Sequence, residues 1–189
     1  MNVAVVMGGY SDEAVISLRS GQLILIHLDK SKYQPYEIHV LKEEWYCLID
    51  SEKYPINKAD FTITKDNQTI KFDVVVNTIH GTPGEDGHMQ AYWELIELPY
   101  SGCTYYQSSL TFNKRDTLSV LSKFNIPKAK SIYVSKGDFI DGDKIVAELD
   151  LPFFVKPNQS GSSLGISMVT RWMICQKHWS LLLQKKMTF

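Results

Sequence analysis

The sequence predicts an α/β fold with an open, mostly parallel sheet, and two observations support this prediction. Residues 3–7 (VAVVM) and 72–79 (FDVVVNTI) form apolar runs typical of strands that are buried on both faces. Each run ends in a glycine-containing turn, and a segment with helical spacing of apolar residues follows. In open sheets of this kind, ligands bind at the carboxyl ends of the strands, which is where both turns fall.

The predicted elements of the first hundred residues alternate between strands and helices. After Gly8 and Gly9 a helical pattern runs to about Leu28, and Ser11 or Asp12 is the candidate N-cap. The remaining elements, in order, are strands at 36–41 and 45–49, a hairpin of residues 61–64 and 69–72 about the turn 65–68, the strand 73–79, and a helix near residues 88–98.

A change of pattern after residues 99–102 (PYSG) predicts a second domain. Its predicted elements are a helix at 108–124, a strand at 131–134, a short helix at 143–149, and two strands joined by the loop 156–165. We therefore divide the chain into an N-terminal domain of residues 1–107, a partial domain of residues 108–170 and a tail of residues 171–189.

The composition is that of an ordinary globular protein: 44% of the 189 residues are hydrophobic and 22% are charged. The formal net charge of −1 gives no reason to expect a nucleic acid or a membrane surface as partner. The apolar run after Met1 is too short for a signal peptide, and no stretch reaches the roughly 20 residues that span a bilayer. Three cysteines without close spacing fit reduced thiols, so we expect a cytoplasmic protein without a Cys–His metal site.

Residues 80–87 (HGTPGEDG) follow a buried strand and predict a ligand-binding loop. Glycines let the backbone approach a ligand and turn its N–H groups toward it, and an ordinary strand-to-helix turn needs one glycine rather than three. His80 is either a core histidine bonded to a backbone carbonyl or a group placed over a reacting ligand. Glu85 and Asp86 could act as an acid–base pair, but we favour a role in bracing the loop and capping the following helix.

Residues 156–165 (KPNQSGSSLG) form a second candidate loop, between two apolar segments. Hydroxyl and backbone N–H groups in such a loop can surround phosphate oxygens, and Lys156 would add a positive charge. The alternative is a flexible hairpin with a solvated lysine.

The turn at residues 8–13 (GGYSDE) is a weaker signal, because a double glycine occurs in many strand-to-helix turns. Glu13 is either a first-turn residue that interacts favourably with the helix dipole or a carboxylate that binds an ammonium group.

In their order along the chain, the segments 8–13, 80–87 and 156–165 resemble the D-alanine–D-alanine ligase family. Residues 80–87 match its H-G-x-x-G-E-D-G signature. The resemblance covers residues 3 to about 170, and it implies a Rossmann-like, pre-ATP-grasp N-terminal domain followed by the first part of an α+β ATP-grasp domain. It also implies a ligase of peptidoglycan synthesis that uses ATP and Mg²⁺ to join two D-alanine molecules through an acyl phosphate. The resemblance further implies a homodimer through the N-terminal domain. A D-alanine–D-lactate ligase is the alternative, because the loop that helps to choose the second substrate is missing.

The resemblance also implies roles for individual residues. Glu13 holds the amino group of the first D-alanine, His80 lies beside the reacting carboxylate, and Ser162 hydrogen-bonds toward Glu13. The phosphate-binding groups are two lysines and the glycine loop: Lys114, Lys156, Gly161, Ser162, Ser163 and Gly165. By itself Lys114 is only a helix-surface lysine. The family's magnesium ligands come later in its sequence, so no residue of this chain is assigned to a metal.

The tail of residues 171–189 differs from the rest of the chain, with four of the twenty Lys and Arg residues, no acid and two of the four tryptophans. We interpret it as a frameshifted or disordered segment. If the reading frame begins one base earlier, the codons allow only Asp in place of Met173 and Ile174, Leu in place of Trp179 and Asp in place of Thr188. These residues fit an acidic amphipathic helix. A vector-derived tail is the rival explanation.

Since the rest of the ATP-grasp module is missing, we expect this chain to be inactive alone. A non-catalytic small-molecule-binding fragment is the alternative function.

Overall fold

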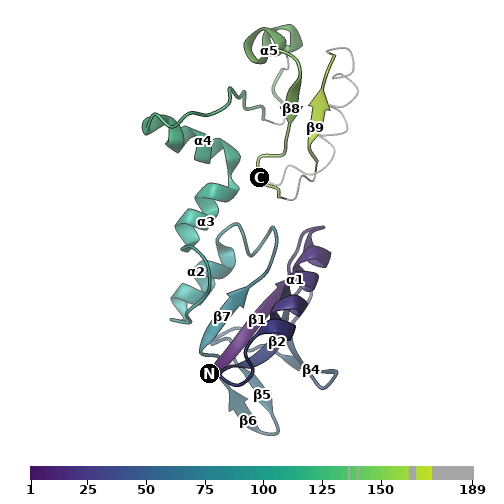
Figure 1. The fold of residues 1–189 in the computed structure, drawn as a ribbon, viewed down its shortest axis with the longest axis vertical. Helices are drawn as coiled ribbons and strands as arrows, with labels where there is room; N and C mark the ends of the chain where they lie inside the picture. Colours follow the sequence, from purple (N-terminus) through teal and green to yellow (C-terminus); the bar gives the residue numbers. More distant parts are fainter. Residues whose placement is uncertain (136, 140, 162–164, 172–189) are drawn as a thin grey trace. The chain divides into compact units, whose positions relative to one another are not determined.

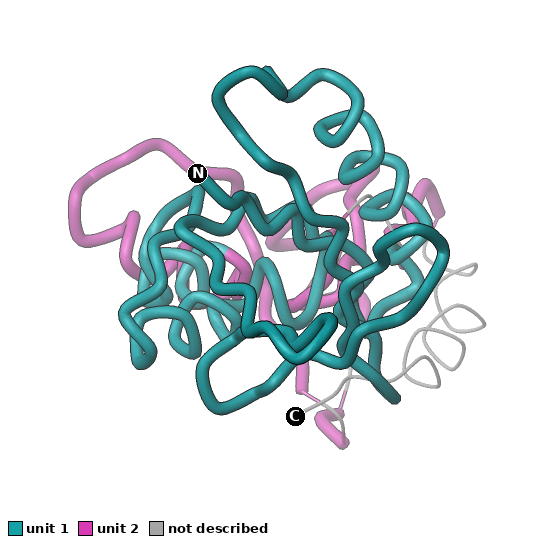
Figure 2. The backbone as a smooth tube through the Cα atoms, turned by 90° about the horizontal axis from the view of Figure 1, so that it is seen from below, with its two compact units in different colours: residues 1–111 teal, residues 112–189 magenta. Residues whose placement is uncertain are grey.

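The structure is a computed structural model of the 189-residue chain, and it describes residues 1–135, 137–139, 141–161 and 165–171. Its backbone divides into two compact units, Met1–Thr111 and Phe112–Phe189, which Figure 2 colours separately. Each unit has a hydrophobic core of its own. No helix in the described part of the chain is long and apolar enough to cross a membrane.

The first unit is built on a five-stranded sheet with the order β4-β3-β2-β1-β7 (Figure 1). The strands are β1 (Asn2–Gly8), β2 (Gln34–Val40), β3 (Trp45–Ile49), β4 (Glu52–Pro55) and β7 (Val74–Asn77). Strand β1 is parallel to both β2 and β7, whereas β3 and β4 extend the sheet in antiparallel fashion. Strand β1 has a neighbour on each side, and its apolar run is buried, with Val3 to Met7 at most 2% exposed. The predicted α/β fold with a mainly parallel sheet is confirmed.

Helix α1 (Ala14–His27) packs on the sheet face that carries Val3, Val5 and Met7. Its close approach depends on Gly21, because a Cβ at this position would lie 2.5 Å from Met7 Cε. A glycine in the middle of a helix costs stability relative to alanine, and here it is needed for packing.

The opposite face of the sheet packs against helix α2 (His88–Leu95) and the hairpin of β5 (Ile63–Lys65) and β6 (Gln68–Ile70). Trp93 and Phe61 are buried in this cluster, with their ring centroids 6.1 Å apart in an edge-on arrangement. The sheet is therefore covered on both sides, as its near-continuous apolar strands predict.

Local backbone geometry explains where the hairpin turns and where α2 ends. Asp66 and Asn67, the two residues between β5 and β6, both adopt positive φ angles (52° and 60°), which suit a tight turn between twisted strands and confirm the predicted hairpin. Helix α2 is three residues shorter than predicted. Glu97 takes φ 57°, and the Leu98 N–H donates to the Trp93 carbonyl at 2.9 Å, closing the helix by a Schellman motif without the usual glycine.

The predicted helix at 108–124 is instead two helices, α3 (Tyr105–Phe112) and α4 (Lys114–Lys123). The break falls at Asn113, whose backbone is extended (φ −89°, ψ 101°) and whose side chain accepts the Asp116 N–H at 3.1 Å. Asn113 is therefore an N-cap, and the second helix begins anew after it.

The described part of the second unit contains α4, α5 (Gly142–Leu149) and the antiparallel pair β8 (Phe153–Val155) and β9 (Ser167–Val169). Its core is small, with Ile145, Phe153 and Val169 at the centre. The predicted strand at 131–134 is not formed. Those residues have no ladder partner, and Ile132 instead packs against this core.

Candidate active site

The turn after β1 ties the sheet to helix α1. Gly8 and Gly9 both have positive φ angles (103° and 108°), which other residues rarely adopt. The Gly8 N–H donates to the buried Ser17 Oγ at 2.9 Å, and the Gly9 N–H donates to the Val40 carbonyl at 2.8 Å. Neither Ser11 nor Asp12 is the N-cap residue, since α1 begins at Ala14 with Glu13 in that position.

Glu13 is buried at the start of α1, with 2% of its surface exposed. Within the described residues, its Oε1 atom has no hydrogen-bond partner. Burying a carboxylate oxygen without a partner is costly, so this arrangement favours a cationic ligand over a solvated first-turn acid. A Cβ on Gly81 would lie 3.0 Å from Glu13 Oε2, so the carboxylate lies directly against the loop of residues 80–87.

His80 follows strand β7 and the buried residues Thr78 and Ile79, and it is half-buried. Its Nδ1 atom lies 3.0 Å from the Thr78 carbonyl oxygen. Because a carbonyl only accepts, Nδ1 carries the proton in this hydrogen bond. The backbone contact expected of a core histidine is therefore present, and it also fixes the ring in one tautomer.

Glu85 and Asp86 brace the loop, as predicted. Glu85 Oε2 accepts the Gly81 N–H at 2.7 Å. Asp86 Oδ1 accepts the N–H of His88, the first residue of α2, at 3.3 Å and lies 2.8 Å from the His88 Nδ1 atom. These carboxylates therefore hold backbone groups of the loop and of the helix start.

Two further loop-holding residues, Asn77 and Gln90, were missed in the sequence. Both side-chain amides donate to the Gly84 carbonyl, from Asn77 Nδ2 at 3.1 Å and from Gln90 Nε2 at 2.5 Å. Gln90 is 4% exposed. No sequence signal identifies this pair, because Asn77 ends a strand and Gln90 occupies an ordinary helical position.

Two hollows open on the first unit. One, of about 400 Å³, adjoins both loops and is lined by aromatic and apolar side chains that include Tyr10, Trp45, Pro83 and Tyr92. Burial raises the pKa of Tyr92 to about 12, so this phenol stays neutral at physiological pH.

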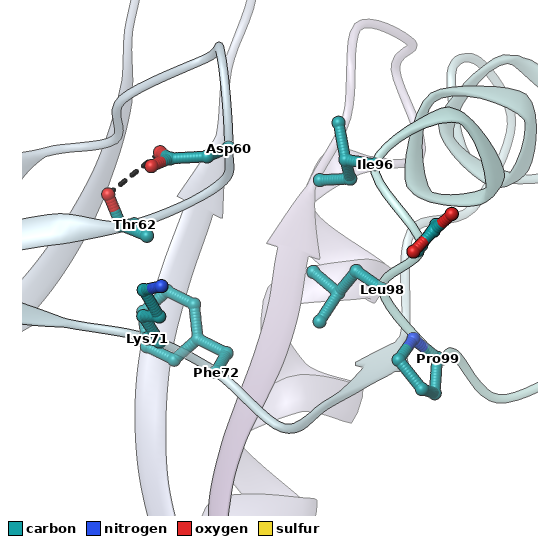
Figure 3. A pocket seen from close by; sticks show the side chains of 8 residues that line it. Asp60, Thr62, Lys71, Phe72, Ile96, Leu98 and Pro99 are labelled. Atoms are coloured by element: carbon teal, nitrogen blue, oxygen red, sulfur yellow. Dashed lines mark hydrogen bonds between the residues drawn. The ribbon is translucent and has the colours of Figure 1, made fainter.

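Figure 3 shows the other hollow, of about 260 Å³, between Lys71 and Phe72 on one side and Ile96 and Leu98 on the other. Lys71 and Phe72 precede β7, whereas the loop of residues 80–87 follows it. This hollow therefore lies at the opposite end of strand β7 from Glu13 and His80.

In the second unit, Lys114 contacts the loop that follows β8. Its Nζ atom donates to the Ser160 carbonyl at 2.6 Å and to the Asn158 carbonyl at 3.4 Å. Lys156 is exposed and Gly161 is half-buried. Gly165 has φ 74°, and a Cβ there would lie 2.9 Å from Pro157 Cγ, so the end of the loop returns to its beginning. Ser162 and Ser163 lie outside the described residues, as does the tail from residue 172 onward.

Asn158 joins this loop to the start of helix α4. Its carbonyl accepts the Lys114 N–H at 3.2 Å, its Oδ1 accepts the Arg115 N–H at 2.9 Å, and its Nδ2 donates to Asn113 Oδ1 at 2.9 Å. With the bond from Asp116 to Asn113, the first three N–H groups of α4 all have protein partners. Any phosphate bound here would therefore depend on the lysine side chains and the loop.

We predict that Asn158→Ala loosens the start of α4. The substitution removes an acceptor at a helix N-terminus, which is worth about 1 kcal/mol, so hydrogen exchange at the Arg115 amide should accelerate by about fivefold. Gln159→Ala is the matched control, because Gln159 is an exposed neighbour in the same loop, and this substitution should keep the protection. Equal exchange rates at Arg115 in the unsubstituted chain and in Asn158→Ala would contradict the prediction.

Comparison with known proteins assigns the chain to a family. The family model described as "D-ala D-ala ligase N-terminus" matches residues 2–103, which is more than half of the chain. The chain belongs to the D-alanine–D-alanine ligase family. The model of the ligase C-terminus matches residues 120–188. This second match includes most of the tail, so the frameshift stays a prediction.

Individual members of the ligase family resemble the chain over most of its length. A D-alanine–D-alanine ligase of Flavobacterium psychrophilum is 73% identical over 169 residues, which is 89% of this chain and 52% of that protein. The D-alanine–D-alanine ligase structure from Coxiella burnetii matches 98% of this chain and 61% of its own, with a TM-score of 0.88 and 27% identity. A Bacillus anthracis ligase complexed with ATP matches 98% and 56%, with a TM-score of 0.74 and 25% identity. The chain spans about half the length of the curated relatives that it matches.

Proposed function

We propose that this chain is the D-alanine-binding half of an ATP-dependent ligase that joins two D-alanine molecules for peptidoglycan precursor synthesis. The observation that carries the proposal is the buried Glu13 carboxylate, whose Oε1 has no partner among the described residues. An amino acid's ammonium group would supply both the charge and the hydrogen bonds that this oxygen lacks. Membership of the ligase family supports D-alanine as this amino acid.

In the complete ligase, the carboxylate of the first D-alanine takes the γ-phosphoryl group of ATP and becomes an acyl phosphate, with release of ADP. The amine of a second D-alanine then attacks the acyl carbon and loses a proton, and the C–O bond to phosphate breaks. Glu13 orients the first substrate, and His80, fixed by Thr78, lies beside the reacting carbonyl. Lys114 and Lys156 stabilise the phosphates, and the glycine loop, with Gly161, Ser162, Ser163 and Gly165, surrounds them.

Magnesium belongs to the proposal only through the family resemblance. Among the described residues, no group of three or more His, Cys, Asp or Glu side chains could hold a metal ion. The described residues therefore do not fit a complete metal site, and no step is assigned to Mg²⁺ here.

Calorimetric titration of this chain with D-alanine, with and without ATP, tests the proposal. We expect weak D-alanine binding, and no ADP release, because the chain spans about half of its relatives. Release of ADP would contradict the expected inactivity. Absence of any D-alanine binding would contradict the assignment of Glu13. A non-catalytic binding fragment and a D-alanine–D-lactate ligase remain the alternatives, and the second substrate is decided by assay of the full-length gene product.

We further propose that the N-terminal domain forms a homodimer, as the family resemblance implies. Helix α1 exposes an apolar stripe, here defined as Val15, Ile16, Leu23 and Ile26, with exposed fractions of 43–65%. Such a stripe on a soluble domain favours a protein contact. We expect Leu23→Asp to shift the sedimentation coefficient from dimer to monomer, whereas Leu95→Asp, at an exposed leucine of α2, leaves it unchanged. A monomeric unsubstituted chain would contradict the proposal.

The origin of the tail is tested by the DNA sequence across codon 170 and several hundred bases downstream. We predict that codons for an acidic helix, and then for the rest of the ligase, appear one base out of frame. If the reading frame is unshifted and a stop codon follows the codon of Phe189, the result would favour a natural short form. The proposed function would then be binding rather than catalysis.

A further inference from the structure

Two loops of the first unit meet at Glu13 and His80, the two residues proposed to hold the first D-alanine, and their surroundings are called the D-alanine pocket below. The turn of residues 8–13 and the loop of residues 80–87 are joined by the Tyr10 N–H, which donates to the Thr82 carbonyl at 2.8 Å. Glycine permits this approach, because a Cβ on Gly9 would lie 3.3 Å from the His80 and Thr82 carbonyl oxygens. The two loops therefore touch through their backbones.

Ser11 links the same two loops through its side chain. Its Oγ donates to the His80 carbonyl at 3.1 Å and accepts the Glu13 N–H at 3.3 Å. A hydroxyl has one donor and can accept as well, so a single side chain serves both bonds. A Cβ on Gly81 would lie 2.6 Å from Ser11 Oγ and 3.0 Å from Glu13 Oε2, so the hydroxyl and the carboxylate lie against one backbone position.

These contacts differ from those of a simple helix cap. A cap accepts an N–H group of the first turn, whereas Ser11 accepts the N–H of Glu13, which is itself the N-cap residue of α1. The donated bond runs instead to a carbonyl 69 positions along the chain, in the other loop. If the Ser11 hydroxyl bonded only at the start of α1, removing it would leave the His80 carbonyl unaffected.

We infer that Ser11 is a positioning residue of the D-alanine pocket. Its hydroxyl fixes the backbone of His80 relative to the backbone of Glu13, so that the two groups proposed to hold the first substrate keep one mutual geometry. Ser11 acts through these two residues, and preorganisation of this kind lowers the cost of binding. The inference rests on the proposed function, in which Glu13 binds the ammonium group.

The test uses ¹H–¹⁵N correlation spectra of the full 189-residue chain, recorded without ligand and during titration with D-alanine. In Ser11→Ala we expect the Gly81 and Thr82 amide resonances to shift without ligand, and D-alanine to bind about tenfold more weakly, which corresponds to one to two hydrogen bonds. Ser11→Thr keeps the hydroxyl and should restore both properties. Ser20→Ala is the matched control, because the Ser20 hydroxyl bonds to Ile16 within α1.

The outcomes separate this inference from the proposed function. Failure of the unsubstituted chain to bind D-alanine would contradict the proposed function, whereas the ligand-free spectra would still report whether Ser11 holds the loop. Unchanged Gly81 and Thr82 resonances in Ser11→Ala, or unchanged D-alanine affinity beside a binding wild type, would overturn the inference. Failure of Ser11→Thr to restore either property would also overturn it.

Discussion

Glu13→Gln is expected to weaken D-alanine binding by about thirtyfold or more, because removing one partner of a buried charge pair costs about 2–5 kcal/mol. The substitution keeps the shape of the side chain and removes only its charge. In a full-length ligase that carries this N-terminal half, it should reduce kcat/KM for dipeptide formation by a similar factor.

The same substitution should stabilise the ligand-free chain. Glu13 is 2% exposed, and its Oε1 has no partner within the described residues, so a neutral amide there avoids part of the cost of burying a charge. We expect a gain of about 1 kcal/mol, measured from hydrogen exchange of the central β1 amides. Glu43→Gln, at an exposed glutamate, is the control and should change neither property. Unchanged D-alanine affinity, or loss of stability in Glu13→Gln, would contradict the role given to this carboxylate.

The second large effect is expected at Gly81, which has φ 71° and lies against the pocket. In Gly81→Ala, the left-handed backbone costs about 1–2 kcal/mol. The new Cβ would also lie 2.6 Å from Ser11 Oγ and 3.0 Å from Glu13 Oε2, and such overpacking costs about 1–3 kcal/mol more. D-alanine binding should fall below detection, since the carboxylate is displaced.

Gly102→Ala is the matched control for this prediction. Gly102 also has a positive φ (116°), but nothing lies within 4 Å of a Cβ built there. It should therefore show the cost of the backbone conformation alone and keep D-alanine affinity. Urea denaturation and D-alanine titration of both variants make the comparison. Equal effects of the two substitutions on binding would show that contact with Glu13 and Ser11 is unimportant.

The features predicted correctly from the sequence are those set by short-range patterns. The apolar run of β1 predicts a strand buried on both faces, because such burial requires a continuous apolar run. Asp66 and Asn67 predict the hairpin because both tolerate positive φ. The composition of residues 80–87 predicts a loop braced by Glu85 and Asp86, and the two carboxylates do hold the loop and the helix start.

The features that were missed depend on partners distant in the sequence. The break before α4 depends on Asn113, and Asn158, 45 residues later, donates to its side chain. Asn77 and Gln90 matter because both bond to Gly84, which no periodicity shows. The expected strand at 131–134 failed because a strand needs a ladder partner, and propensity alone does not provide one.

Within the candidate site, the sequence identified the residues but not their surroundings. Glu13 could be read equally as a solvated acid of the first helical turn, and only its burial and its unpaired oxygen distinguish the two interpretations. Lys114 was assigned through the family resemblance, and the structure adds its bonds to the loop carbonyls at residues 158 and 160. The link from Ser162 to Glu13 lies outside the described residues and stays a prediction.

The most direct test of the central claim compares D-alanine with propionate, which lacks the ammonium group, as ligands of the 189-residue chain. Chemical shifts of the Glu13 and Gly81 amides, followed during each titration, report on the pocket. If Glu13 binds the ammonium group, D-alanine should shift both resonances saturably, and propionate should not shift them at the same concentrations. Equal responses to the two ligands, or no response to D-alanine, would contradict the account.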